Sequence, residues 1–422
     1  MLLNFRVENF LSFKDLVEVD LKPSSIKELE ENIALIPTSN TRVLKSAVVY
    51  GANSSGKSNL LKAIIFMKSF VMNSSKEGQA NQDINVESFK LNSRTEKKPS
   101  LFEIIFYHEG LTYRYGFTVD SHRVHREWLF YSKINKEYKY FVREDANQFD
   151  IDDKFEEGKG LVKVTRDNAL FLSVVAQFNG SISMELLRWF TDLKYITDTN
   201  KQFHQNYTSK LLENKIYHEW IMKFLKHVDL GFSDLEMEKI NFGEIDVVNK
   251  RFREFFLLEN KGDTLIKTIH YQYDENGNEV GKIFFNLNKN ESLGTQKYFA
   301  ISGLIIETLA TGNVLIIDEF DARLHPNLSS FIVNLFNSKL NNPRNAQLIF
   351  VTHNTNLLSK KRLRRDQILL AEKDRKLGFT SISSLMDKKV RTDEAYEKNY
   401  LEGEYGGVPY IQEDINLFDN YI

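Results

Sequence analysis

The chain has 422 residues, of which 42% are hydrophobic, so it can bury a large core in one or two domains. Lysine and arginine number 56 against 58 for aspartate and glutamate, and the net charge of -2 excludes a generally basic nucleic-acid binder, although a local basic patch stays open. There is no cysteine, which excludes disulfides, thiolate zinc sites and cysteine nucleophiles.

The first part of the chain is predicted to be rich in strands. Leu2–Phe13 and Val43–Tyr50 are strand-like, and the second of these runs leads into a glycine-rich loop and a helix. Leu101–Val119 alternates apolar and polar residues around His108-Glu109-Gly110, which indicates a hairpin, and Trp128–Val142 continues in the same style. We therefore expect an antiparallel sheet in this part of the chain.

The second part is predicted to begin with helices and then to alternate strands and helices. From Ser181 to about Ile240 the apolar spacing is helical, and no heptad pattern lasts long enough for a long coiled coil. The next strands should turn at Asn276-Gly277. The other expected elements are strands over 265–287, a helix over 293–310, a strand over 314–317, a helix over 327–339 and a strand over 347–351. Together the elements predict an α/β fold with a mixed-sheet core, an antiparallel β subdomain and a helical insert.

The string from Gly51 to Ser58 fits the pattern G-x-x-x-x-G-K-[ST] of a phosphate-binding loop. Glycines let backbone N–H groups close around phosphate oxygens, and the following helix adds the positive end of its dipole. Lys57 is expected to reach the outer phosphates, and Ser58 to hold Mg²⁺ through its hydroxyl. The predicted ATP-binding residues are Gly51, Asn53, Ser54, Ser55, Gly56, Lys57, Ser58 and Asn59.

Two carboxylates, Asp318 and Glu319, directly follow the apolar run Val314–Ile317. A buried strand of a parallel sheet has this appearance, and ligands gather at its carboxyl end. Asp318 is therefore predicted to hold Mg²⁺, and Glu319 to activate water as a general base. The alternative is a strand that ends in a solvated acidic pair.

His353 follows the next apolar strand, where it could contact the γ-phosphate or the attacking water, although a single histidine is often structural. Ser292 is a suitable N-cap for the helix that precedes the acidic strand. The start of that helix, with Gly294 and Thr295, could grip the γ-phosphate bound to a second copy, or it could be an ordinary capped helix. Gln177 follows the apolar run 170–176, where an amide at a strand end could ligate Mg²⁺; a buried structural glutamine is the alternative.

The order of these motifs resembles the ATP-binding-cassette superfamily, in the branch with the chromosome-maintenance and recombination-repair ATPases. In that resemblance Gly51–Ser58 corresponds to Walker A, Asp318 and Glu319 to Walker B, Asp321–Pro326 to the D-loop and His353 to the switch histidine. The usual signature Leu-Ser-Gly-Gly-Gln is here Glu-Ser-Leu-Gly-Thr-Gln, which keeps a hydroxyl and one glycine. The resemblance implies ATP and Mg²⁺ as ligands, an ATPase activity, and a homodimer or higher even-numbered oligomer. It also implies four parts: a first ATPase lobe with the β subdomain over 1–178, an insert over 179–287, a second lobe over 288–390 and a tail over 391–422.

Three strings look like the bacterial abortive-infection ATPases of the AbiL/RloA type: Asn9–Phe13, Leu170–Asn179 and the tail segment Tyr400–Pro409. This narrower resemblance implies an anti-phage role, in which the ATPase controls a separate effector such as a nuclease or toxin.

Other functions are also considered. A transporter subunit would not need the insert, a fused nuclease would need a second acidic cluster, and a DNA-repair ATPase that acts directly on DNA is the main rival. The basic run Lys360–Arg365 could be a solvated helix end or a contact to nucleic acid or to an acidic partner. No apolar run reaches about 18 residues and the N-terminus lacks a signal peptide, so we expect no membrane contact and a soluble cytoplasmic protein.

Overall fold

The computed structural model describes residues 1–36, 40–77, 79, 81–133, 136–145, 148–197, 201–239, 264–388, 390–391 and 394–409. The chain divides into two compact units. The loop unit comprises Leu2–Glu30, Leu35–Phe190 and Thr355–Ile422 and contains the phosphate-binding loop. The carboxylate unit comprises Met1, Glu31–Ala34 and Thr191–Asn354 and contains Asp318 and Glu319. The predicted insert and tail extend over residues 240–263, 392–393 and 410–422, which lie outside the described residues.

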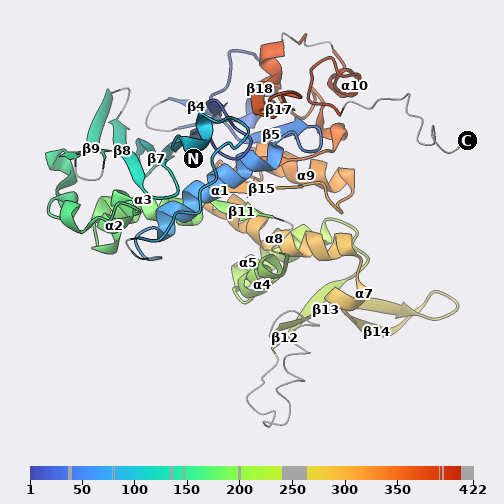
Figure 1. Ribbon diagram of the computed structural model, residues 1–422. Helices are drawn as coiled ribbons and strands as arrows, with labels where there is room; N and C mark the ends of the chain where they lie inside the picture. Colours follow the sequence, from blue (N-terminus) through green and yellow to red (C-terminus); the bar gives the residue numbers. More distant parts are fainter. Residues whose placement is uncertain are drawn as a thin grey trace, which may run out of the picture. The chain divides into compact units, whose positions relative to one another are not determined.

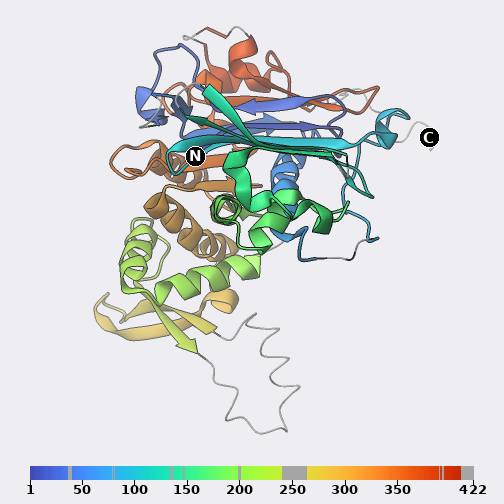
Figure 2. The ribbon, with the colours of Figure 1, turned by 90° about the vertical axis from the view of Figure 1, so that its left-hand side faces the viewer.

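The loop unit contains a seven-stranded antiparallel sheet with the order β10-β9-β8-β7-β6-β1-β2, seen edge-on in Figure 2. The predicted hairpin is confirmed, because β6 pairs with β7 and the chain turns through Glu109 and Gly110, both with positive φ. The strands are β1 (Leu2–Glu8), β2 (Val17–Asp20), β6 (Ser100–His108), β7 (Leu111–Val119), β8 (Val124–Lys133), β9 (Lys136–Glu144) and β10 (Gln148–Ile151).

Aromatic side chains fasten helices to one face of this sheet. Phe66 of α1 (Lys57–Asn73) lies 4.9 Å from Phe102 of β6, between ring centroids. Phe106, further along the same face of β6, stacks on Trp189 of α3 (Ser181–Asp192) at 4.0 Å. Strand residues two apart point to the same face, so alternate residues of β6 hold both helices.

Three strands of a mixed sheet lie in the loop unit and carry the phosphate-binding loop. The predicted strand Val43–Tyr50 is two strands, β4 (Arg42–Leu44) and β5 (Ser46–Gly51). Strand β5 is buried along its whole length and runs parallel to β17 (Ile368–Lys373), which pairs antiparallel with β18 (Thr380–Ser384). Helix α10 (Tyr396–Leu401) follows these strands in the sequence (Figure 1).

In the carboxylate unit, β15 (Val314–Ile317) runs parallel to both β11 (Lys194–Ile196) and β16 (Gln347–Val351), and the acidic pair directly follows β15. The structure confirms four predicted elements within a few residues, namely the helices over 293–310 and 327–339 and the strands over 314–317 and 347–351. The hairpin β13–β14 turns near Asn276-Gly277 as expected, with Gly277 at φ 80°. The elements are β11 (Lys194–Ile196), α4 (Lys201–Leu212), α5 (Lys215–Lys226), β12 (Asp234–Lys239), β13 (Thr264–Tyr273), β14 (Glu279–Asn286), α7 (Leu287–Asn290), α8 (Leu293–Thr311), β15 (Val314–Ile317), α9 (Pro326–Asn337) and β16 (Gln347–Val351); β3 (Ile33–Leu35) is shared between the two units.

Helix α2 (Phe171–Gln177) corrects one prediction. The segment before Gln177 is expected from its sequence to be a strand, but a short, mostly apolar run has no periodicity that separates a buried strand from a buried helix. Strands β11 and β12 also interrupt the region that was expected to be helical. The predicted fold class is confirmed: the protein is α/β, with an antiparallel β subdomain and helices α4 and α5 in the insert. Among the described helices, none has both the length and the apolar character needed to span a membrane.

Candidate functional site

Two glycines give the phosphate-binding loop its shape. A Cβ atom on Gly51 would lie 2.5 Å from the carbonyl oxygen of Ala371. Gly56 has φ 96°, and a Cβ atom there would lie 2.2 Å from Oγ1 of Thr380. The backbone therefore passes too close to its neighbours for any side chain at either position, and Gly56 also needs a left-handed conformation that only glycine adopts without cost.

The loop closes around the ammonium group of Lys57. This side chain is buried, and its Nζ donates hydrogen bonds to the carbonyl oxygens of Gly51 at 2.7 Å and Ala52 at 2.8 Å. Oγ of Ser55 is also buried and has no hydrogen-bond partner among the described residues. Helix α1 starts at Lys57, so its positive end lies at the same place. A cation, a buried hydroxyl and a helix N-terminus in one loop fit a polyphosphate.

Ser12 and Thr380 support the loop from outside, and the sequence analysis did not predict this role for either. Oγ1 of Thr380 lies 2.8 Å from Oγ of Ser12 and 2.8 Å from the carbonyl oxygen of Ser55. Asn59, predicted to bind ATP, donates from Nδ2 to Oγ of Ser12 at 2.8 Å. Ser12 belongs to the string Asn9–Phe13, which is noted above only for its resemblance to a family. No sequence pattern predicts a role for Thr380.

Walker B follows β15 in the carboxylate unit. Asp318 is half-buried, and its backbone N–H donates to the carbonyl oxygen of Ile196 on the neighbouring strand at 2.9 Å. Glu319 is exposed and has φ 48°, and its carbonyl oxygen accepts a hydrogen bond from Nζ of Lys297 at 2.9 Å. A left-handed glutamate is a strained conformation, and such strain is common at functional sites.

The loop that carries His353 lies beside the turn that follows Walker B. Strands β15 and β16 run parallel with Ile317 opposite Phe350, so the residues after the two strands emerge at the same edge. Oδ1 of Asp321 accepts hydrogen bonds from the hydroxyl of Thr352 and from the backbone N–H of His353. The structure therefore brings the carboxylates and the exposed histidine to one edge of this sheet, as the sequence predicted.

Helix α8, predicted to carry the signature, begins against the turn that contains Arg323, predicted to be the D-loop. Ser292 is its N-cap, as predicted, and its Oγ accepts a hydrogen bond from the backbone N–H of Thr295 at 3.1 Å. A Cβ atom on Gly294 would lie 2.9 Å from the carbonyl oxygen of Arg323. The helix can approach the D-loop this closely because position 294 has no side chain.

Gln177 does not join the loop. It is the exposed last residue of α2, and Ser173 of that helix donates a hydrogen bond to the carbonyl oxygen of Val71, near the far end of α1. Val71 lies thirteen positions after Ser58 in α1, which is about 20 Å at 1.5 Å per residue. Since the predicted strand is a helix docked at the far end of α1, nothing places Gln177 next to Ser58.

The basic run Lys360–Arg365 is partly structural. The Arg364 side chain is fully buried, and its guanidinium group pairs with Asp366 at 2.8 Å. Arg365 pairs with Glu28 at 2.8 Å. Two of the five cations of the run are therefore committed to internal ion pairs rather than to a solvated helix end.

A family model described as "AAA domain, putative AbiEii toxin, Type IV TA system" matches residues 46–359. The chain belongs to this family. The matched range begins with β5 and contains the phosphate-binding loop, helix α8, Asp318, Glu319 and His353. The recognition of an ATPase of the abortive-infection type is therefore confirmed at the level of the family.

Comparison with curated proteins finds no match. One matching solved structure is described as "Structure of the recombination mediator protein RecF-ATPrS in RecFOR pathway". It is 16% identical, the match covers 87% of this chain and 97% of that chain, and the TM-score is 0.29. At this TM-score the match supports no conclusion about the fold or the function of this protein.

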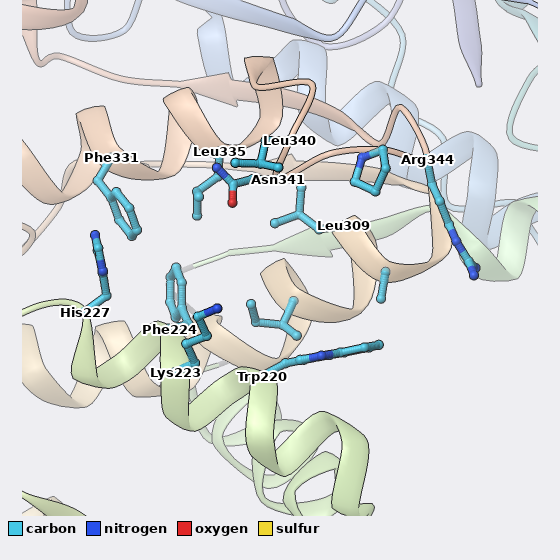
Figure 3. A pocket seen from close by; sticks show the side chains of 13 residues that line it. Trp220, Lys223, Phe224, His227, Leu309, Phe331, Leu335, Leu340, Asn341 and Arg344 are labelled. Carbon is cyan, nitrogen blue, oxygen red and sulfur yellow. The ribbon is translucent and has the colours of Figure 1, made fainter.

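A cavity of about 600 Å³ lies in the carboxylate unit between α5, α8 and α9 (Figure 3). Trp220, Phe224 and Phe331 form much of its apolar lining, and Lys223 and Arg344 add positive charge. None of the predicted nucleotide-binding residues lines it, so it has no part in the chemistry proposed below.

Proposed function

We propose that this protein binds Mg²⁺–ATP and hydrolyses the ATP slowly. The observation that carries the proposal is the phosphate-binding loop, in which the buried ammonium group of Lys57 is enclosed by the loop's own carbonyl oxygens. That geometry holds a positive charge where polyphosphate oxygens bind. Membership of an AAA-domain family supports the same conclusion.

The remaining candidates take the following roles in this proposal. Lys57 binds the outer phosphates, while Ser58 and Asp318 are the oxygen ligands of Mg²⁺, a metal that prefers such hard donors. Bound Mg²⁺ neutralises phosphate charge. Glu319 takes the proton of the attacking water, and its exposed carboxylate on a strained backbone is available for this. His353 contacts the γ-phosphate or that water.

Two substitutions separate binding from turnover. Lys57→Ala should weaken ATP binding by about a hundredfold or more, because the phosphates lose their buried cation. Glu319→Gln should keep the affinity and lower turnover by about a hundredfold or more, because an amide cannot accept the proton. Binding is measured by calorimetry and turnover by phosphate release. Wild-type turnover in the Glu319→Gln protein would show that the base is another residue.

We further propose that two copies share each nucleotide, with Ser292, Gly294 and Thr295 of one copy facing the γ-phosphate on the other. The exposed start of α8, capped by Ser292, supports this role. The test mixes Ser292→Arg chains with Lys57→Ala chains. Each variant alone should be inactive, whereas a mixed dimer keeps one intact composite site. No recovery of turnover, with mixed dimers shown to form, contradicts the shared site.

The biological role we propose is control of a separate effector, such as a nuclease or toxin, in an abortive-infection response to phage. The family description, which names a putative toxin of a toxin–antitoxin system, supports a defence context. The near-zero net charge and the internal ion pairs of Arg364 and Arg365 favour a protein partner over strong DNA binding. ATP would favour one arrangement of the protein and so hold or release the effector.

Phage challenge of bacteria that express the chain tests this role. The chain alone should give no protection and no nuclease activity. The chain with its genomic neighbour should protect, and Lys57→Ala should remove that protection. Full protection or robust DNA cleavage by the chain alone would contradict the control of a separate effector.

A further inference from the structure

A cavity of about 690 Å³ opens beside the phosphate-binding loop, within the loop unit. Its first wall is the loop itself, over 52–55. The second wall is the end of β17 and the turn that follows, over 371–375. The third wall comes from the C-terminal part of the described chain, namely Gly403 and residues 406–409, which we call the C-terminal wall. The volume is within the range of pockets that hold small molecules.

The C-terminal wall is attached directly to the Walker A strand. Tyr400 is buried, and its ring lies 5.6 Å from the ring of Tyr50, the residue before Gly51. Its hydroxyl donates a hydrogen bond to the carbonyl oxygen of Gly407 at 3.0 Å. Burial raises the pKa of Tyr400 to about 12, so the hydroxyl keeps its proton at neutral pH. One side chain thus connects the strand that leads into the loop with the wall that faces it.

Glycines allow the wall to lie this close. Gly406 and Gly407 both have positive φ, at 78° and 72°. A Cβ atom on Gly406 would lie 1.4 Å from Oε1 of Glu372, which belongs to the second wall. The nearest atom to a Cβ on Gly407 would be Cα of Gly51, at 3.6 Å. Glycine is therefore favoured at Gly406 by the close approach to Glu372 and by the left-handed backbone, and at Gly407 by the left-handed backbone.

The lining of the cavity suits the non-phosphate part of a nucleotide. Phe379 contributes an aromatic ring to the lining, with the ammonium group of Lys14 5.5 Å from its centre, and Ser381 contributes a hydroxyl. Lys373 and Arg375 are exposed cations of the lining, next to the carboxylates of Glu372 and Asp374. The cavity is continuous with the loop residues that precede Lys57, so a ligand with phosphates in the loop can place its nucleoside here.

We propose that the C-terminal wall forms part of a nucleoside pocket, so that the last described segment of the chain takes part in binding the ATP. This inference rests on the proposed function, because it assumes that the loop binds the phosphates of a nucleoside triphosphate. It adds a binding element that no Walker motif contains. Nucleotide binding and the seating of residues 400–409 then stabilise each other.

A comparison of ATP with inorganic tripolyphosphate tests the pocket, since both carry three phosphates but only ATP has a nucleoside. The main variant is Gly406→Ala. Its matched control is Gly110→Ala, which also places alanine at a positive φ, of 85°, but with no atom within 4 Å of the new Cβ. Affinities for a slowly hydrolysed ATP analogue and for tripolyphosphate, each with Mg²⁺, are measured by calorimetry. A ligand that binds too weakly to titrate directly is measured by competition against the other.

Gly406→Ala should lower the affinity for the ATP analogue by about fivefold or more and leave the affinity for tripolyphosphate within about twofold of the wild type. Gly110→Ala should change neither affinity. Tyr400→Phe is the second variant, because it keeps the buried ring and removes the hydroxyl that donates to Gly407. This variant should also lower the affinity for the ATP analogue by about fivefold, as expected for one lost hydrogen bond. Unchanged ATP affinity in both variants, or an equal loss for both ligands, overturns the nucleoside pocket. Lys57→Ala separates this outcome from failure of the proposed function, because it should weaken both ligands.

Discussion

The carboxylate of Asp321 accepts a hydrogen bond from the backbone N–H of His353 at 3.0 Å. The same oxygen, Oδ1, accepts a second hydrogen bond from the hydroxyl of Thr352. The hydrogen bond from the backbone N–H fixes the backbone of His353 and does not involve its imidazole ring. A residue three positions past Asp318 thus positions the loop after the neighbouring strand, and the position of His353 depends on the turn that follows Walker B.

We expect Asp321→Ala to lower ATP turnover by about tenfold while ATP affinity stays within about threefold. The reason is that the Thr352–His353 backbone loses its acceptor, whereas the phosphate-binding loop keeps all its own contacts. Asp321→Asn is the matched control, because its amide oxygen can still accept both hydrogen bonds, and it should keep most of the turnover. Turnover and affinity are measured separately, by phosphate release and calorimetry.

A double-mutant cycle with His353→Ala shows whether Asp321 acts through the histidine. In the His353→Ala background, Asp321→Ala should cost little additional turnover. Additive losses in the double variant would mean that Asp321 contributes by another route.

The close approach of α8 to the D-loop gives a second prediction. Gly294→Ala introduces a Cβ that would lie 2.9 Å from the carbonyl oxygen of Arg323, and backbone must shift to accommodate it. Alanine is a better helix former than glycine by about 1 kcal/mol. Because this gain offsets the cost of the backbone shift, the melting temperature should change little. Turnover should fall by about tenfold, because the signature helix and the D-loop move apart. The neighbouring, exposed Leu293→Ala serves as the control and should retain turnover. An active Gly294→Ala protein would show that this contact has no role in catalysis.

Thr380 provides a third prediction. Thr380→Val keeps the shape of the side chain but removes the hydroxyl that lies between Ser12 and the carbonyl oxygen of Ser55. The phosphate-binding loop should become less well ordered. ATP affinity should fall by about fivefold to tenfold, which is the loss expected when one or two hydrogen bonds are removed. Calorimetry measures the affinity. Thr380→Ser retains the hydroxyl and should bind ATP as the wild type does, so equal losses in both variants would point to packing instead.

The parts of the site that sequence reasoning predicted are those whose chemistry is local. The loop over Gly51–Ser58 needs glycines at fixed spacing, and four apolar residues before Asp318 define a buried strand. Ser292 is recognisable as an N-cap because capping joins residues three apart. In each case a short window of sequence contains all the groups that interact.

The parts that were missed depend on contacts between distant residues. Thr380 meets Ser12 across 368 positions of the chain, and no pattern within either segment records that pairing. No local cap marks the start of the helix Phe171–Gln177, because its first N–H groups donate to Glu127, which lies 44 positions before Phe171. Local sequence patterns therefore fail where a distant side chain decides the structure.

The same buried glutamate gives the last prediction, which concerns stability. Glu127 is fully buried, and its carboxylate accepts hydrogen bonds from the backbone N–H groups of Phe171 at 2.6 Å and Leu172 at 3.0 Å. The hydroxyl of Tyr115 donates a third, at 2.9 Å, and the buried Arg143 lies 3.9 Å away. These contacts fasten the start of α2 to the antiparallel sheet.

Glu127→Ala would leave these buried donors and the arginine without their partner. We expect the free energy of unfolding to fall by about 3 to 5 kcal/mol, the range for breaking a buried charged network. The matched control is Glu144→Ala on β9, whose ion pair with Arg126 is more than half exposed and should contribute less than about 1 kcal/mol. Urea unfolding followed by tryptophan fluorescence measures both, since Trp128 and Trp189 lie in the loop unit. Equal stability of the two variants would show that α2 is held by its apolar packing and not by Glu127.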